Sequence, residues 1–276
     1  MDFDFYKLHT SGNDFILVNL LSHSDLAPDT FPGIARLACR RHTGIGANGI
    51  IFLTAGEQTA VRADFYDSRK SSVSCYDALT CAARYLFDSG MASDSKITLE
   101  SCLGVSIVNV IDSRNFRVEI GTPQNADTGA IISPTPETDL FRNAGMLGRS
   151  LPVAPIRLSH DMTVVITEER KKSIRFLARE LSDTKPNRTP VFVRTTSRDQ
   201  CDLFTWRSAG IPDYSANAGG AVVAAVTSGF CDTEVTFYLR GHSFYAQWDT
   251  RKNSVFVTSP VEYVCSGSYY IDEGTG

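Results

Sequence analysis

A short polar segment turns into an apolar, alanine-rich helix in the stretch Ser72-Val73-Ser74-Cys75-Tyr76-Asp77-Ala78-Leu79-Thr80-Cys81-Ala82-Ala83-Arg84-Tyr85. This pattern places the thiol of Cys75 at a predicted helix N-terminus. Free N–H groups and the positive end of the helix dipole favour an anion there. We therefore expect the pKa of Cys75 to lie below that of a free thiol, about 8.5, so that it can act as a base or a nucleophile.

A second helix start lies in the other half of the chain. It reads Asp213-Tyr214-Ser215-Ala216-Asn217-Ala218-Gly219-Gly220-Ala221 and corresponds to the first, with Asn217 where a second thiol would be expected. An amide offers hydrogen bonds but no proton transfer at neutral pH. Two helix starts of this kind suit the binding of a carboxylate.

The composition limits the classes of function. The 276 residues carry a formal net charge of −4 and are 42% hydrophobic, which predicts a globular protein large enough for two lobes and argues against a general nucleic-acid binder. The longest apolar runs are far shorter than the roughly 20 residues that cross a bilayer, and we find no secretion signal, so we expect a cytoplasmic protein without a membrane partner.

Seven cysteines are scattered along the chain without a close-spaced framework. Such spacing favours reduced thiols over disulfides. Neither Cys-x-x-Cys nor a histidine cluster occurs, and we therefore predict no metal.

Alternating apolar segments and turn residues recur along the whole chain and predict an α+β protein. Helices are predicted over 32–41, 75–89 and 217–227, and the predicted strands are 15–20, 49–53, 61–66, 97–99, 105–111, 116–120, 156–158, 163–167, 191–195, 203–206, 234–239, 243–248 and 254–258. A Pro-, Gly- and Thr-rich linker begins near residue 121. We place an N-terminal lobe at 1–122, to which the last strand, 261–276, returns, and a C-terminal lobe at 123–260.

Four segments together resemble the diaminopimelate epimerase family. Lys7-Leu8-His9-Thr10-Ser11-Gly12-Asn13-Asp14-Phe15 resembles its His-x-x-Gly-Asn-Asp-Phe signature, and Arg41-His42-Thr43-Gly44-Ile45-Gly46-Ala47-Asn48-Gly49 follows Arg-His-x-Gly-Ile-Gly-Ala-Asp-Gly. Cys75 to Tyr85 is similar to Cys-Gly-Asn-Gly-x-Arg-Cys-x-Ala-Arg-Tyr. Arg207-Ser208-Ala209-Gly210, followed by Asp213 to Ala221, resembles Arg-Gly-Ala-Gly-Glu-Thr-x-Ala-Cys-Gly-Thr-Gly-Ala, with Ile211-Pro212 as an insertion.

The resemblance implies a fold of two pseudo-symmetric lobes, each a mixed or antiparallel sheet wrapped around a central helix. It also implies a homodimer and a cofactor-independent amino-acid isomerase, in which one cysteine removes the α-proton as thiolate and a second returns a proton from the far side. By position Cys75 is the first base, and Asn217 occupies the position of the second. Asp77 is a further candidate acid or base.

The resemblance assigns further residues to substrate binding. The positions that match or replace the family's substrate contacts are Asn13, Asn48, Asp67, Tyr76, Ala78, His160, Arg207, Ser208, Ala218 and Gly219. Arg207 would clamp a carboxylate through paired hydrogen bonds.

The departures from the family pattern lie where substrate and chemistry meet. Tyr76-Asp77-Ala78 replaces Gly-Asn-Gly, Trp206 replaces a glutamate, and Asn217 replaces the second cysteine. We therefore expect a racemase, epimerase or related isomerase that acts on an amino-acid-like small molecule other than diaminopimelate. The alternative is an inactive paralogue or a small-molecule binding protein on the same scaffold.

Structural roles compete with the functional ones. Asn217 is also a good helix N-cap. For Arg207 the alternative is a solvated charge at a strand end, although the family position favours the carboxylate clamp. Cys81, further along the first helix, is a packing residue in our interpretation.

Overall fold

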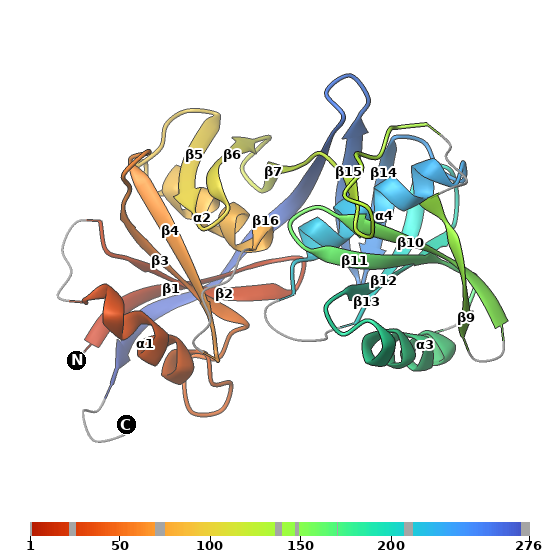
Figure 1. The fold of residues 1–276 in the computed structure, drawn as a ribbon. Coiled ribbons are helices and arrows are strands. Elements are labelled where there is room, and N and C mark those ends of the chain that lie inside the picture. Colours follow the sequence, from red (N-terminus) through yellow and green to blue (C-terminus); the bar gives the residue numbers. More distant parts are fainter. Residues whose placement is uncertain are drawn as a thin grey trace. The chain divides into compact units, whose positions relative to one another are not determined.

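The computed structural model describes residues 2–21, 26–69, 75–135, 140–146, 149–169, 171–206 and 212–271 (Figure 1). The chain divides into two compact units. Unit 1 comprises Met1–Val118, Gly210–Asp213 and Pro260–Gly276, and unit 2 comprises Glu119–Ala209 and Tyr214–Ser259. Among the described residues, no helix has both the length and the apolar character needed to cross a membrane.

Unit 1 is built on a mixed sheet whose strands form a closed circuit. The order is β1-β2-β3-β4-β5-β6-β7-β16, and β16 pairs back onto β1. The strands are β1 (Asp2–Thr10), β2 (Asn13–Asn19), β3 (Gly49–Ala55), β4 (Val61–Asp67), β5 (Lys96–Ser101), β6 (Gly104–Val110), β7 (Asn115–Gly121) and β16 (Ser254–Tyr270). The chain enters unit 2 within β7, belongs to unit 1 again over Gly210–Asp213, and returns to unit 1 within β16.

Two helices cover the strands of unit 1. The one-turn 3-10 helix η1 (Pro28–Thr30) leads into α1 (Phe31–Ala38), which packs its apolar face on β3 and β4. The central helix α2 (Tyr76–Asp88) contacts each of β1 to β6 and is buried over most of its length. Its alanines and Leu79 explain this burial, because small and apolar side chains let strands approach from several sides.

Unit 2 has a related order of elements. Its sheet runs β16-β15-β14-β13-β12-β11-β10-β8, and β9 pairs with β10. The elements are β8 (Gln124–Asn125), β9 (Arg142–Met146), β10 (Arg149–Arg157), β11 (Asp161–Ile166), α3 (Lys171–Thr184), β12 (Thr189–Thr195), β13 (Gln200–Thr205), α4 (Tyr214–Thr227), β14 (Glu234–Leu239) and β15 (His242–Asp249). In each unit a parallel strand pair flanks the outer helix, β2–β3 around α1 and β11–β12 around α3.

Helix α4 is buried at every position. A Cβ at Gly219 would lie 3.1 Å from Leu158 Cδ1, and one at Gly220 would lie 2.8 Å from Met162 Sδ. The two glycines therefore let the helix backbone approach its neighbours more closely than alanine would. Because the helix has no polar face, its sequence lacks the amphipathic pattern of a surface helix.

All predicted strands and helices exist, with differences at their ends. Helix α1 stops at Ala38 and not at Arg41, because the N–H groups of Gly46 and Ala47 bond the carbonyls of Ala38 and Cys39 at 2.9 and 3.2 Å. Helix α4 begins at Tyr214, three residues before its predicted start. The sequence interpretation missed α3, β1, β8 and β9, and the predicted last strand, 261–276, overlaps β16.

Candidate active site

Cys75 stands at the N-terminus of α2, as predicted. Its backbone is extended, with φ −158° and ψ 113°, and its carbonyl accepts the first helical hydrogen bond, from the N–H of Leu79 at 3.2 Å. The next N–H, that of Tyr76, donates to Asp213 Oδ2 at 3.0 Å. The anion at this helix start is therefore a carboxylate of the chain itself.

Asn13 links this helix start to the N-terminal hairpin. Ser11 and Gly12 have positive φ values of 51° and 81° and form the two-residue turn between β1 and β2, which places Asn13 at the start of β2. Asn13 Nδ2 donates to Asp77 Oδ2 at 2.8 Å and to the Pro212 carbonyl at 2.5 Å. The hairpin thereby orients a carboxylate in the first turn of α2.

A second layer of polar contacts holds Asn13 in place. Asn48 Nδ2 donates to Asn13 Oδ1 at 2.9 Å, and Arg41 Nη2 donates to Asn48 Oδ1 at 3.0 Å. Arg41 also pairs with both carboxylate oxygens of Asp14. The segments around residues 13 and 48 that carry the family resemblance thus form one network that ends on Asp77.

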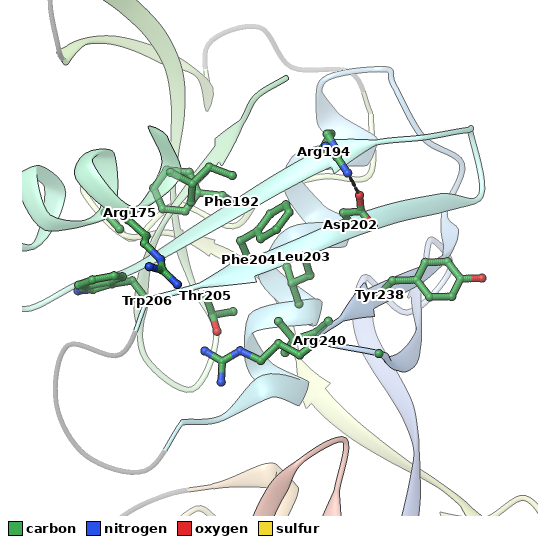
Figure 2. Close-up of a pocket in the computed structure, with 14 residues that line it drawn as sticks. Arg175, Phe192, Arg194, Asp202, Leu203, Phe204, Thr205, Trp206, Tyr238 and Arg240 are labelled. Carbon is green, nitrogen blue, oxygen red and sulfur yellow. Dashed lines mark hydrogen bonds and ion pairs between the residues drawn. The ribbon is translucent and has the colours of Figure 1, made fainter. Parts of the chain in front are cut away.

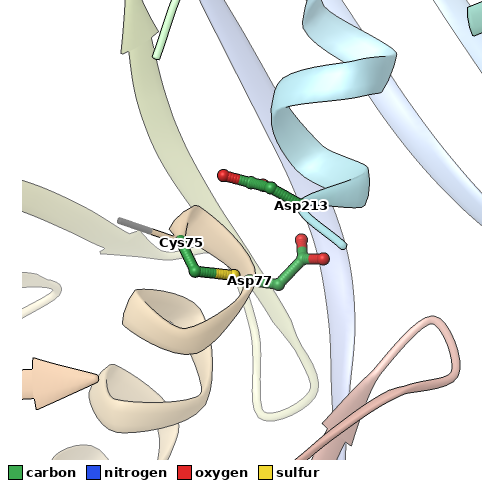
Figure 3. Close-up of side chains that lie close together, drawn as sticks. All are labelled: Cys75, Asp77 and Asp213. Carbon is green, nitrogen blue, oxygen red and sulfur yellow. The ribbon is translucent and has the colours of Figure 1, made fainter. Parts of the chain in front are cut away.

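One thiol and two carboxyl groups lie close together at the start of α2. One ligand-type atom from each of Cys75, Asp77 and Asp213 lies within 4.8 Å of the others, and all three residues are buried (Figure 3). The Cys75 thiol donates a long hydrogen bond to the Pro212 carbonyl, with 3.7 Å between Sγ and O. We call Cys75, Asp77 and Asp213 the acidic cluster.

The expected low pKa of Cys75 is wrong. Cys75 has no exposed surface, and this burial raises its pKa well above the ordinary value. The negative charges of Asp213 and Asp77 raise the pKa further and outweigh the N–H groups of Ala78 and Asp77, which lower it. At neutral pH the Cys75 thiol is therefore protonated.

The second predicted half-site lies in unit 2, near the start of α4. His160 Nε2 lies 3.2 Å from Asn217 Oδ1, and His160 Nδ1 lies 3.0 Å from Ser159 Oγ. Burial lowers the pKa of His160, against the opposing effects of Asn217 and Asp161. A neutral imidazole with its proton on Nε2 satisfies both contacts, because it donates to Asn217 and accepts from Ser159.

Asn217 is not the N-cap of α4. The helix begins at Tyr214, so Asn217 lies within its first turn and is buried. Its side-chain oxygen is bonded to His160 rather than to the first N–H groups of the helix. The two residues that we predicted here therefore form one neutral, hydrogen-bonded pair.

The remaining predicted residues are spread over several environments. Tyr76 and Ala78 are buried in the first turn of α2, and Ala218 and Gly219 are buried in α4. Asp67 ends β4, where its carboxylate accepts from Arg69 Nε at 3.0 Å. Arg207 and Ser208 lie outside the described residues.

A separate pocket of about 880 Å³ lies in unit 2 between α3 and strands β12 to β14 (Figure 2). Arg175, Trp206 and Arg240 line it, together with Arg194, whose Nε donates to Asp202 Oδ2 at 3.0 Å. Trp206 also packs on the apolar cluster under α3. Of the predicted catalytic and substrate-binding residues that the structure describes, none lines this pocket.

Sequence reasoning missed the part played by two neighbouring residues. Pro212, which we took for part of an insertion, accepts from Asn13 and Cys75 through its carbonyl, and Asp213 accepts the Tyr76 N–H. The available signal for Asp213 was its position directly after Ile211-Pro212, the two residues inserted relative to the family pattern. Its contact with a helix start 137 residues earlier in the sequence could not be derived from local pattern.

Comparisons with known proteins agree with the motifs. The protein-family model described as diaminopimelate epimerase matches residues 5–125 of this chain. A diaminopimelate epimerase from Pelotomaculum thermopropionicum is 27% identical, over 96% of this chain and 98% of that protein. One from Halothermothrix orenii is also 27% identical, over 99% of this chain and 100% of that protein.

Solved structures share the fold at low sequence identity. A PhzF-family phenazine biosynthesis protein from Bacillus anthracis superimposes with a TM-score of 0.68 and 13% identity, covering 98% of this chain and 100% of that one. A hydroxyproline epimerase from Agrobacterium vitis, with bound trans-4-hydroxy-L-proline, superimposes with a TM-score of 0.65 and 11% sequence identity. The match covers 100% of this chain and 94% of that one. The fold is thus that of these α+β proteins, and the sequence is similar to diaminopimelate epimerases over nearly its whole length.

Proposed function

We propose that this protein is a cofactor-independent isomerase that moves a proton on a carbon acid of an amino-acid-like substrate. The observation that carries the proposal is the acidic cluster, in which a buried thiol lies within 4.8 Å of two buried carboxylates. Relatives and fold neighbours named as epimerases support the same reaction class. Paired groups of unequal acidity are what general acid–base catalysis needs.

The proposed reaction transfers protons between the substrate and two groups of the acidic cluster. A carboxylate of the cluster, Asp213 or Asp77, removes the substrate C–H proton, and the Cys75 thiol delivers a proton to the resulting carbanion. The thiolate then recovers a proton from the carboxylic acid, which restores the starting state. Because the thiol is the donor, this scheme reverses the thiolate role that the sequence predicts for Cys75.

The proposal assigns supporting roles to the other predicted residues. Asn13 and Asn48 orient Asp77, and His160 holds Asn217 as a hydrogen-bonding group for the substrate. We further propose that Asp67, Tyr76, Ala78, Arg207, Ser208, Ala218 and Gly219 contact the substrate. Because the Pro212 carbonyl contacts Cys75 Sγ, Pro212 must shift before a substrate reaches the sulfur.

The two units share the arrangement of a central helix among strands, which supports a division into lobes near residue 122. The family resemblance supports a homodimer. Light scattering coupled to size-exclusion chromatography measures this state directly.

The test is incorporation of solvent deuterium at the α-carbon across a panel of amino acids and imino acids. We expect exchange with at least one compound in the wild-type protein and a loss of about 100-fold or more in Cys75→Ala, because one proton-transfer group is removed. Cys81→Ala is the matched control, since Cys81 is also buried on α2 but lies outside the cluster. Chiral chromatography of the product separates inversion from exchange with retention.

Two outcomes would contradict the proposal. One is the absence of exchange with every compound of the panel. The other is exchange that Cys75→Ala and Cys81→Ala leave equally intact. In the second case the acidic cluster would not take part in proton transfer.

A small-molecule binding protein without turnover is the second candidate function. The observations that favour it are the complete burial of Cys75 and the replacement of the second thiol by Asn217. Loss of one member of a catalytic pair removes most of its activity, because the two members act as a unit. A ligand that raises the melting temperature at stoichiometric concentration, without deuterium exchange, would favour this candidate.

A further inference from the structure

Two further cysteines lie side by side in unit 2. Cys201 Sγ, at the start of β13, is 3.4 Å from Cys231 Sγ, in the segment between α4 and β14. Both residues are buried and both thiols are free. A disulfide requires about 2.05 Å between sulfurs, so the pair has only about 1.4 Å to close.

Backbone hydrogen bonds hold the two cysteines in this position. The N–H of Cys231 donates to the Ala225 carbonyl at 3.2 Å, and the N–H of Asp232 donates to the Arg198 carbonyl at 2.8 Å. Arg198 and Asp232 also form an ion pair. The segment with Cys231 is thereby fixed to the turn that leads into Cys201.

The two thiols differ in acidity. The pKa of Cys231 is lowered by the hydrogen bond between the two sulfurs and by the Arg198 charge, against the effect of burial. The pKa of Cys201 is raised by the same hydrogen bond and by burial. A more acidic thiol backed by a second thiol is the arrangement in which the first attacks an oxidant and the second resolves the product.

We propose that Cys201 and Cys231 form a redox modification site that reacts with small-molecule disulfides. The Cys231 thiolate attacks the oxidant disulfide, which releases one thiol and leaves a mixed disulfide on the protein. The Cys201 sulfur then attacks Cys231 Sγ, which releases the second thiol and forms the Cys201–Cys231 bond. The two protein thiols are oxidised, the small disulfide is reduced, and the two protons leave on the released thiols.

The bond would close a ring over residues 201–231, which contains α4 and Asn217. Closing such a ring restricts the unfolded chain and stabilises the folded one. The inference stands apart from the proposed isomerase function, because neither sulfur belongs to the acidic cluster.

The test uses the full chain with Cys102→Ser and Cys265→Ser, since these two cysteines are exposed and would react first. The protein is incubated with oxidised glutathione, alkylated under denaturing conditions and weighed by mass spectrometry. We expect the loss of two hydrogen atoms, two fewer alkylated thiols and a peptide that links Cys201 to Cys231. The melting temperature should rise by about 5 °C and return after dithiothreitol.

Matched variants separate this site from general oxidation. Cys201→Ser should stop at a glutathione adduct on Cys231, and Cys231→Ser should lose the reaction. Cys39→Ser and Cys81→Ser, which remove other buried thiols, should oxidise as the parent does. Five alkylated thiols in the treated parent, or a link between any other pair, would overturn the proposal.

Discussion

At the scale of single residues, the acidity of Cys75 depends on its neighbours more than on its helix. A helix N-terminus lowers a thiol pKa when the site is open and free of other anions. Here the sulfur is buried, and Asp213 and Asp77 lie beside it. Desolvation and like charge therefore exceed the effect of the helix N–H groups.

The substitution Asp213→Asn tests this balance. Asparagine keeps an oxygen that can accept the Tyr76 N–H, so we expect the unfolding free energy to change by less than about 1 kcal/mol. The substitution removes the charge that raises the pKa of Cys75 most, so this pKa should fall. Thiolate absorbance against pH, measured with Cys102 and Cys265 replaced by serine, reports this change.

Asp77→Asn is the matched control for that measurement. Asp77 raises the pKa of Cys75 less than Asp213 does, so its removal should lower the pKa less. If the pKa of Cys75 in Asp213→Asn is equal to or higher than in the parent, burial alone sets the acidity of this thiol.

The residues of the site could be predicted from the sequence only in part. Cys75, Asn13 and Asn48 were found because they lie in motifs with fixed spacing, and the structure connects them through Asp77 and Pro212. The Pro212 and Asp213 contacts were missed because they join segments far apart in the chain. No local pattern encodes such a contact.

At the scale of elements, helices with clear chemical signals were predicted best. Helix α2 has a polar start and an alanine-rich body, and α4 is a run of small apolar residues. Helix α3 was missed although its sequence carries a helical signal, because the buried Ile174, Leu177 and Leu181 recur at helical spacing among charged residues. Its helical form depends on packing against β12.

The loop after α1 provides a stability prediction at the same scale. A Cβ at Gly44 would lie 2.3 Å from the Leu37 carbonyl oxygen and 2.8 Å from that of Ala38. These are backbone atoms at the end of α1, so the loop must shift to make room. We expect Gly44→Ala to lower the unfolding free energy by about 2–4 kcal/mol in chemical denaturation.

Gly33→Ala, a substitution within α1 itself, is the matched control. A Cβ at Gly33 would meet nothing within 4 Å, and alanine is the better helix former. We expect a gain of about 0.5–1 kcal/mol. Equal effects of the two substitutions would mean that the close approach of the loop to α1 does not stabilise the fold.

At the scale of the whole molecule, the sequence was sufficient for the fold class because the same order of elements recurs. Each unit contains a parallel strand pair around an outer helix and a central helix among strands. In the structure β16 pairs with β1 from Val261 to Tyr270. The substrate could not be predicted, because the departures from the family lie at the residues that would contact it.

The pH dependence of folding is a property of the whole molecule that the ion pairs determine. Burial raises the pKa of Asp14, but the hydrogen bond and charge of Arg41, with Lys7, outweigh it and lower the pKa below 3.8. Arg188 and Arg157 likewise lower the pKa values of Asp127 and Asp161. A carboxyl group with a lowered folded pKa stabilises the protein above its unfolded pKa, and this contribution disappears as the pH falls through the folded value.

We therefore expect the melting temperature to be steady near neutral pH and to fall as the pH drops below about 4. Asp14→Asn should cost about 1 kcal/mol at pH 7 and reduce the acid-dependent loss, since its paired charge is then absent. Asp183→Asn, on the exposed surface of α3, should change neither quantity. If Asp14→Asn and the parent lose stability in parallel between pH 5 and pH 2, the contact of Asp14 with Arg41 contributes nothing to folding, and the acid sensitivity has to come from other groups.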